Sequence, residues 1–564
     1  MKTLQTSPAL SDNGAPFSAM DRLTSSPVGL AALSGVLLGT SYIPFPPWAI
    51  FFCYIPLWLV WLDNASWRRV LWTGWVAQFV GTLIGFNWVA YTVHEFGDLP
   101  WPFAIIALFL FASLANLQIP LAGAAWWIFS RVFRLNTTGK IWALPVFMSI
   151  GERAFPMIFD WHFGYTWLWA GFPAFHLADM IGFMGLSTIG SFFNAAFLQA
   201  LLKAREGSRW WPWAVSVPVL FLTLNVWGHF HGEPRPTDAT LRFLVVQPNI
   251  GNKEKMAAEQ DEALRGPVID RFHQLTLRGL ERDRPVDFVV WPETAVPEVI
   301  DEPALLTGYA ARLRQLVAGT NTKLITGGYS QLESTGQVTN SFFILGEKGE
   351  WLVPPYHKTI LLAFGEYLPG ADLIPGLREQ VPQVGDYGRG PGPTVLTAGH
   401  VKIGAQICYE GLFDWFSRQQ ARDGAHVLVN LTNDAWYGAW QQPYQHLYMT
   451  LARAVEVRRP LVRSTNTGIS ASVLGSGEIL AQSPTNEEWY SVYEIPYATD
   501  PPDTLFMTTG PWLVPSILAL ALVVVAATFR IRSSDERVNL QARGAAKSAS
   551  SYLGISSLPS AWQR

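Results

Sequence analysis

The sequence predicts a polytopic α-helical membrane domain joined to an α/β domain on the extracytoplasmic side. Three observations predict this arrangement. Roughly the first 230 residues are dense in Trp, Phe, Leu and Ala and contain several runs near the length of about 20 residues that crosses about 30 Å of hydrocarbon. Residues 238–501 have mixed charge, and β-branched runs alternate there with helical stretches, which is typical of an α/β domain. A last apolar run, 508–529, predicts a C-terminal transmembrane helix.

The N-terminus is polar, and the overall charge is small. Residues 1–26 contain Ser, Pro, Asn and Asp and lack the basic-then-apolar order of a cleaved signal peptide, so we expect a disordered lead. The net charge of -3 is too small to indicate nucleic acid as a partner, and no Lys/Arg-rich stripe with interleaved aromatic residues occurs.

The predicted membrane domain covers 27–230 and has about seven helices. The run at 141–157 is the weakest candidate because it contains Glu152 and Arg153, and the first two runs are short and interrupted by prolines. The candidate spans, with the C-terminal one, are 28–44, 46–62, 70–92, 101–130, 141–157, 178–202, 211–229 and 508–529.

Basic residues alternate between the loops, as they do where short cytoplasmic loops collect Lys and Arg. The loop at 94–98 has none. An odd number of spans then places the α/β domain on the periplasmic face of a bacterial inner membrane and leaves 530–564 as a cytoplasmic tail. Basic residues follow the second, fourth, sixth and last spans at Arg68, Arg69, Arg131, Arg134, Lys140, Lys203, Arg205, Arg209, Arg530, Arg532, Arg537 and Arg543.

Chemically useful side chains end three of the predicted strands of the α/β domain, as expected where a sheet presents its edge to a ligand. They follow the strands as Trp291-Pro292-Glu293, as Gln406-Ile407-Cys408-Tyr409-Glu410 and as Asn430-Leu431-Thr432-Asn433-Asp434. The predicted strands are 241–246, 288–291, 324–327, 341–345, 403–408, 426–431 and 461–464.

Cys408 is a candidate nucleophile. The only other cysteine, Cys53, falls in a predicted span, so Cys408 has no disulfide partner in its own domain. An inert buried cysteine is the simpler interpretation of such a residue. A thiol attacks only as a thiolate, however, and Glu293 and Lys358 supply a candidate base and a candidate cation. Each charged residue alone could be an ordinary exposed one, but their combination indicates a site.

Several motifs, taken in order, resemble those of a known group of enzymes. The chain resembles the nitrilase (carbon-nitrogen hydrolase) superfamily, and more closely its membrane branch, the bacterial apolipoprotein N-acyltransferases. This resemblance implies an αββα sandwich for 238–501 and a catalytic Glu293, Lys358 and Cys408, with no metal and no cofactor. The motifs are Trp291-Pro292-Glu293-Thr294, Phe364-Gly365-Glu366-Tyr367-Leu368-Pro369, Ile407-Cys408-Tyr409-Glu410, Thr432-Asn433-Asp434-Ala435-Trp436-Tyr437-Gly438, Gln445-His446, Arg453-Ala454-Val455-Glu456 and Thr465-Asn466-Thr467-Gly468, with Gly151-Glu152-Arg153 and Ala178-Asp179 in the membrane half.

The resemblance also implies a reaction and its partners. A fatty acyl chain would move from a phospholipid donor to the α-amine of a diacylated apolipoprotein, through a thioester on Cys408, at the membrane. Glu293 would be the base, and Lys358 would favour the thiolate and hold the oxyanion. Glu366 and Glu410 would orient Lys358 and the thiol, and Tyr409 would shape the acyl site.

Other positions are less determined by the sequence. Trp436 and Tyr437 could line the acyl site or only pack the strand end, and His446 is expected to be a structural hydrogen-bonding residue rather than a second base. Met256 stands where relatives commonly have Trp, so a lipid contact is in question there. Ala363 replaces a frequent Pro.

Two alternative functions remain open, and so does the role of one loop. The Gly- and Pro-rich stretch 369–393 suits either a mobile flap over the site or a plain surface loop.

The chain could be a membrane-tethered nitrilase-type amidase, although a tether needs one span rather than about eight. It could also be a non-enzymatic transporter or scaffold, as polar residues inside spans would allow, although no inverted repeat of broken helices is apparent.

Overall fold

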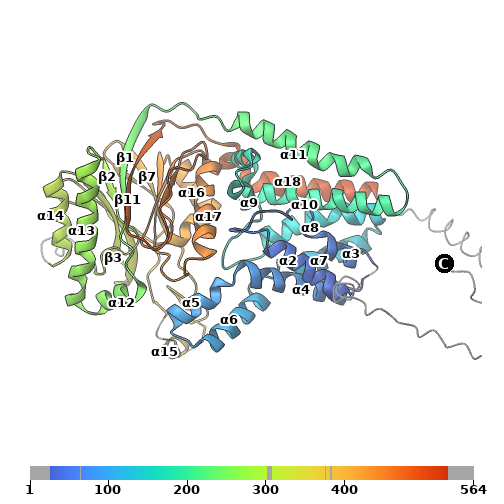
Figure 1. Ribbon diagram of the computed structural model, residues 1–564, viewed down its shortest axis with the longest axis horizontal. Coiled ribbons are helices and arrows are strands. Elements are labelled where there is room, and N and C mark those ends of the chain that lie inside the picture. Colours follow the sequence, from blue (N-terminus) through green and yellow to red (C-terminus); the bar gives the residue numbers. More distant parts are fainter. Residues whose placement is uncertain are drawn as a thin grey trace, which may run out of the picture.

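A computed structural model describes residues 26–63, 65–300, 308–371, 373–374, 376–381 and 384–530. The predictions for 1–25 and for 531–564 concern residues outside these ranges. Figure 1 shows two parts side by side, a layered α/β part and a bundle of helices.

Two sheets form the centre of the α/β part. β8 and β9 are buried at every residue, because helices or a second sheet cover both faces, and this burial explains the apolar run Val427-Leu428-Val429 at the start of β8. One sheet has the order β11 (Trp489–Tyr497), β1 (Ala239–Gln247), β2 (Phe288–Val290), β3 (Lys323–Gln331), β4 (Val338–Leu345) and β5 (Tyr356–His357); the other has β10 (Ala471–Val473), β9 (Leu461–Thr465), β8 (Val427–Thr432), β7 (Val401–Ile407) and β6 (Thr394–Ala398).

Helices cover the outer face of each sheet (Figure 1). The six-stranded sheet carries α12 (Asn252–Gln260), α13 (Arg265–Arg282) and α14 (Ala310–Thr320), and the five-stranded sheet carries α16 (Asp414–Arg422) and α17 (Gln442–Val457). The αββα sandwich is therefore confirmed, and all seven predicted strands are present. The sequence missed β5, β6, β10 and β11, three of which have five residues or fewer, while β11 is a half-exposed edge strand.

The second part is helical. Among the described residues three helical segments, Trp101–Val132, Pro173–Arg205 and Trp211–His231, are long and apolar enough to cross a membrane, and Trp67–Gly85 with Trp88–Gly97 adds a fourth if the bent pair is one span. The helices are α2 (Pro27–Gly39), α3 (Ile55–Leu62), α4 (Trp67–Gly85), α5 (Trp88–Gly97), α6 (Trp101–Leu114), α7 (Gln118–Val132), α8 (Thr137–Ala154), α9 (Tyr165–Trp169), α10 (Ala178–Arg205), α11 (Trp211–His231) and α18 (Leu505–Thr528).

Four expected helices differ from the structure. The run at 28–44 is helical only to Gly39, and the run at 101–130 is interrupted between α6 and α7. The run at 46–62 becomes helical only from Ile55, with Pro56 in the first turn, where a helix tolerates a residue without an N–H. The run at 70–92 is broken between α4 and α5, which meet at a bend of 61°. Gln445 of α17 holds this break: its amide nitrogen donates to the Gly85 carbonyl at 2.8 Å, and its amide oxygen accepts from the Trp88 indole at 3.0 Å.

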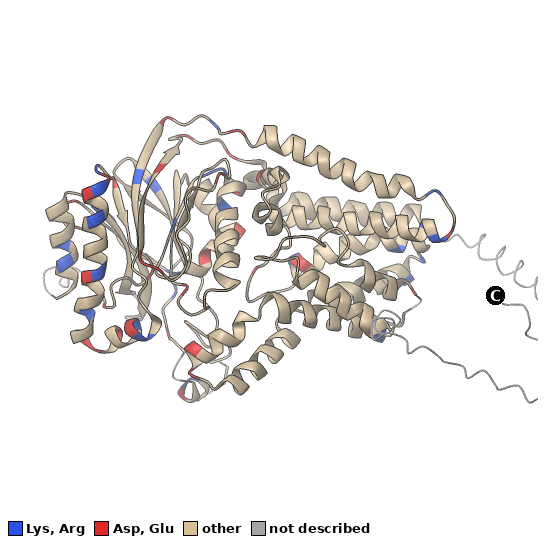
Figure 2. Ribbon diagram, viewed as in Figure 1, with Lys and Arg blue, Asp and Glu red and all other residues tan. Residues whose placement is uncertain are grey.

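Charge divides the two parts (Figure 2). Lys, Arg, Asp and Glu are spread over the α/β part, whereas the helices are almost free of them until the bundle end farthest from the sheets, where basic residues reappear. The α7–α8 turn and the end of α18 meet at that end, since the Asn136 amide donates to the Phe529 carbonyl at 3.0 Å. Apolar helices with charge confined to their ends fit a membrane protein.

Candidate active site

Cys408 lies at a sharp turn between β7 and a short 3-10 helix, Cys408–Leu412. Its φ is 49°, in the left-handed region that a side chain other than glycine's occupies at a cost of about 1–3 kcal/mol. The Asn430 amide steadies the turn by donating to the Cys408 carbonyl at 3.2 Å. The turn holds the thiol at the end of the sheet, with the residue only 6% exposed.

A buried cluster of one lysine, two carboxylates and one amide lies beside this turn. Lys358 follows β5 directly, and its ammonium donates to Glu293 at 3.0 Å and to Glu366 at 2.7 Å. The Asn340 amide on β4 donates to the same two oxygens, at 2.7 Å and 3.2 Å. The two donors thus fix both carboxylates in a single orientation.

Glu410 connects the cysteine turn to the lysine segment. One of its oxygens accepts from the Ile407 amide at 2.8 Å, next to Cys408. The other accepts from the Thr359 amide at 2.6 Å, next to Lys358, and from the Tyr356 hydroxyl at 2.6 Å. The carboxylate therefore orients both segments through their backbones rather than by touching the thiol or the ammonium.

The environment leaves the thiol protonated and the lysine charged. Burial raises the pKa of Cys408 above its ordinary value, Glu293 adds to the rise, and Lys358 opposes it. Burial acts to lower the pKa of Lys358, but Glu293 and then Glu366 raise it well above its ordinary value. A thiol held as S–H needs a base to become a nucleophile, and a permanently charged lysine can hold a developing negative charge.

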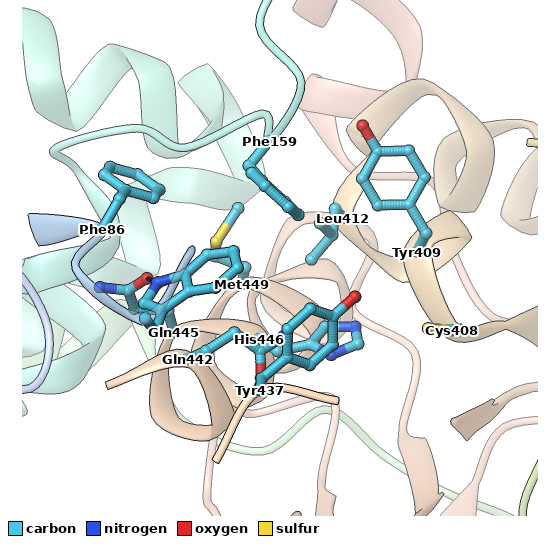
Figure 3. A pocket seen from close by; sticks show the side chains of 11 residues that line it. Phe86, Phe159, Cys408, Tyr409, Leu412, Tyr437, Gln442, Gln445, His446 and Met449 are labelled. Atoms are coloured by element: carbon cyan, nitrogen blue, oxygen red, sulfur yellow. Dashed lines mark hydrogen bonds between the residues drawn. The ribbon is translucent and has the colours of Figure 1, made fainter. Parts of the chain in front are cut away.

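Cys408 opens into a cavity lined mainly by apolar and aromatic side chains (Figure 3). Phe86, Trp88 and Phe159 come from the helical part, and Tyr409 and Tyr437 from the α/β part. The Phe159 and Tyr437 rings lie at steep angles to the Trp88 ring, 74° and 83°, with ring centroids 5.0 Å and 5.3 Å away. The two parts of the protein therefore build this cavity together.

The structure separates the remaining predicted site residues. Tyr409 and Tyr437 line the cavity, whereas Trp436 packs edge-on against Phe96 of α5 at 4.5 Å and is not among the lining residues. Met256 is 38% exposed on α12 and does not line the cavity, so its contact with lipid stays a prediction.

Ala363 belongs to the loop that presents Glu366. Ala363 bridges to Tyr367, and the Leu362 amide donates to the Glu366 carboxylate at 2.8 Å. Ala363, which stands in place of a frequent Pro, is therefore one of the two residues that close this loop. Downstream, Leu373 and Ile374 are 85% and 55% exposed, which agrees with a surface segment and leaves the flap untested.

Sequence reasoning missed Asn340, Lys255 and Phe159. Lys255 is buried beside the cluster, where it donates to the Thr294 hydroxyl and, at 3.3 Å, to the Glu293 carbonyl. Burial lowers the pKa of Lys255 despite the nearby Glu259 and Glu293 carboxylates. β4 is buried at every residue from Thr339 to Leu345, so no alternation distinguishes Asn340, and nothing local in the sequence marks Phe159.

Comparison with known proteins covers both parts. Residues 34–196 match the apolipoprotein N-acyltransferase N-terminal domain, and residues 245–499 match the carbon-nitrogen hydrolase family. An apolipoprotein N-acyltransferase of Bdellovibrio bacteriovorus is 43% identical over 89% of this chain and 94% of its own length. One from Geobacter metallireducens is 30% identical over 89% and 95%. Nit3 of Saccharomyces cerevisiae, a nitrilase-superfamily member, superposes with a TM-score of 0.36 at 16% identity, over 50% of this chain and 97% of its own.

Proposed function

The chain belongs to the apolipoprotein N-acyltransferase family and is an acyltransferase that acylates the N-terminus of lipoproteins, and we propose that Glu293, Lys358 and Cys408 carry out the transfer. The observation that supports these roles is the buried cluster in which Lys358 joins Glu293 and Glu366 beside a cysteine that opens into an aromatic cavity. The donor is a phospholipid, and the acceptor is a lipoprotein whose terminal cysteine already carries a diacylglyceryl group.

The first half-reaction loads the cysteine. Glu293 takes the proton of the Cys408 thiol, and the thiolate attacks the ester carbonyl of the phospholipid. Lys358 and the backbone N–H of Tyr409 hold the oxyanion. As the C–O bond breaks, Glu293 returns the proton to the leaving lysophospholipid alkoxide, so the products are a thioester and an unchanged carboxylate.

The second half-reaction transfers the acyl chain from Cys408 to the acceptor. The neutral α-amine of the acceptor attacks the thioester carbonyl, a C–N bond forms and the C–S bond breaks. Glu293 takes one proton from the attacking nitrogen and passes it to the departing sulfur. Cys408 and Glu293 are then ready for another phospholipid.

The cavity suits a thioester that must survive until the acceptor arrives. Its walls are mainly apolar and aromatic, and excluding water slows hydrolysis. Phe86 and Trp88 lie at the α4–α5 break of the helical part, so the cavity extends from Cys408 to the apolar helices. This arrangement supports entry of the acyl chain from the bilayer.

The proposed location is the bacterial inner membrane, with several spans and the α/β domain in the periplasm. The basic residues at the bundle end remote from the sheets support this orientation (Figure 2). A reporter active only in the cytoplasm, fused after Gly232, should give no signal, and one fused after Arg209 should give a strong signal. A strong signal after Gly232 would reverse the topology.

A covalent adduct tests the mechanism. Incubation of the purified protein with phospholipid and no acceptor should add the mass of one acyl group to the peptide that contains Cys408, and neutral hydroxylamine should remove it. Cys408→Ser is the matched control and should yield no hydroxylamine-sensitive adduct. Absence of the adduct from active wild-type protein would refute the thioester route.

The same assay separates the tethered-amidase alternative, and family membership argues against the transporter. A diacylated lipopeptide with a free α-amine should discharge the acyl-enzyme, and its N-acetylated form should not, because the acetylated nitrogen is not a nucleophile. Discharge by water at the same rate without lipopeptide would favour the amidase.

A further inference from the structure

A buried aspartate–histidine pair shares the cavity of Cys408. His446 on α17 is 5% exposed, lines this cavity, and its Nδ1 lies 2.8 Å from the Asp434 carboxylate. The other ring nitrogen, Nε2, is buried and has no hydrogen-bond partner among the described residues. Figure 3 shows His446 among the side chains that converge on the cavity.

The partners of Asp434 fix which nitrogen of His446 carries the proton. Asp434 accepts from the Arg463 guanidinium at 2.8 Å, and all three side chains are nearly fully buried. Burial acts to raise the pKa of Asp434, but His446 and Arg463 lower it below its ordinary value. An ionised Asp434 only accepts hydrogen bonds, so whenever His446 is neutral its Nδ1 is the donor and its Nε2 presents a lone pair.

The reaction with the acceptor releases two protons from nitrogen, and Glu293 transfers only one of them. The α-amino group has an ordinary pKa of about 7.7–8.0, so at neutral pH the acceptor arrives mainly as an ammonium ion. Its nitrogen loses two protons on becoming a secondary amide. Glu293 passes one of them to the Cys408 sulfur. The other must leave the ammonium before attack, because a protonated nitrogen has no lone pair.

We propose that Nε2 of His446 takes this first proton from the acceptor's α-ammonium, a role that rests on the proposed function above. The N–H bond of the ammonium breaks, an N–H bond forms on the imidazole, and the neutral amine attacks the thioester. Asp434 stabilises the imidazolium. After turnover the imidazolium gives the proton to water, so the atoms and charges balance.

A second hollow provides an approach for the ammonium. It meets the Cys408 cavity at Trp88 and Tyr437, which line both, and Asp434 forms part of its wall. Polar groups share the rest of its wall with apolar ones, among them Glu95 and the buried Thr467 hydroxyl, which has no partner among the described side chains. The acyl chain and the polar acceptor can therefore reach Cys408 from different sides.

The experiment compares two nucleophiles on preloaded acyl-enzyme. A diacylated lipopeptide has an α-ammonium to deprotonate, whereas hydroxylamine is already neutral near neutral pH. His446→Asn keeps an amide donor toward Asp434 but removes the basic nitrogen. The ratio of lipopeptide to hydroxylamine discharge rates should fall by about 10² or more in this variant, the usual contribution of a positioned base.

Each outcome is decisive. A purely structural role for His446 would slow both nucleophiles together, and an unchanged ratio would overturn the proposal. His446→Gln is the second variant and should show the same fall. If neither variant can be loaded with acyl chain, His446 serves the fold or the first half-reaction and the proposal fails. Failure of wild-type enzyme to load would instead refute the proposed function.

Discussion

Asn340→Ala should slow acyl-enzyme formation without touching the three proposed catalytic residues. The substitution removes the donors to Glu293 at 2.7 Å and to Glu366 at 3.2 Å, while the backbone bond from Lys358 to the Asn340 carbonyl at 2.9 Å remains. A hydrogen bond to a charged group contributes about 1.5–3 kcal/mol. At about 1.4 kcal/mol per factor of ten, loss of the shorter bond predicts a rate about 10- to 100-fold lower.

The assay is the rate at which excess phospholipid loads Cys408, followed by mass spectrometry. Gln420→Ala is the matched control, because Gln420 is also a buried amide that donates twice, to the Thr394 and Ala405 carbonyls, but away from the cluster. The control should lower the melting temperature with much less effect on loading. A loading rate within about twofold of wild type in Asn340→Ala would show that Lys358 alone orients the base.

Three further predictions concern other residues. Glu293→Gln and Lys358→Ala should each lower acyl transfer by about 10² to 10⁴, and retention of half the wild-type rate in either would refute its role. Met256→Trp should be tolerated and Met256→Asp should impair use of the phospholipid donor, since an apolar side chain is predicted to meet lipid there; an unaffected Met256→Asp variant would place the residue off the substrate path. Burial raises the pKa of Glu410 to about 7, although the Tyr356 hydroxyl and backbone amides act to lower it. As pH falls through about 7, a carboxyl oxygen of Glu410 becomes protonated and faces hydrogen-bond donors, so the rate of acyl loading should decline. Glu410→Gln should load slowly at every pH without this inflection, and an identical pH profile in the variant would exclude Glu410 as its cause.

The pattern of apolar and polar residues was enough to predict the two parts of the chain and the order of the main strands. The residues 427–429 are all apolar because both faces of β8 are buried, so the effect of burial is visible in the sequence itself. Cys408, Glu293 and Lys358 could be selected because strand ends carry functional groups and because a lone thiol needs a base and a cation.

Short or edge strands could not be predicted, because β5 and β10 have two and three residues and little periodicity. The break between α4 and α5 was equally hidden. Asn87 is the one polar residue between Ile84 and Ala90, and the carbonyl freed at Gly85 is satisfied by Gln445, which lies 360 residues further along the chain. A bend that depends on an amide so distant in the sequence cannot be predicted from the residues around it.

What the sequence by itself determined is the class of each part and the choice of candidate reactive side chains, since burial periodicity and residue chemistry are local properties. Only the tertiary structure decided which groups surround them. Asn340 between two carboxylates, Phe159 from the helical part on the wall of the cysteine cavity, and His446 with one nitrogen on Asp434 and the other free among the described residues all depend on contacts between segments far apart in the chain. Such contacts arise from the packing of the two sheets against the helices, and no spacing within one segment encodes them.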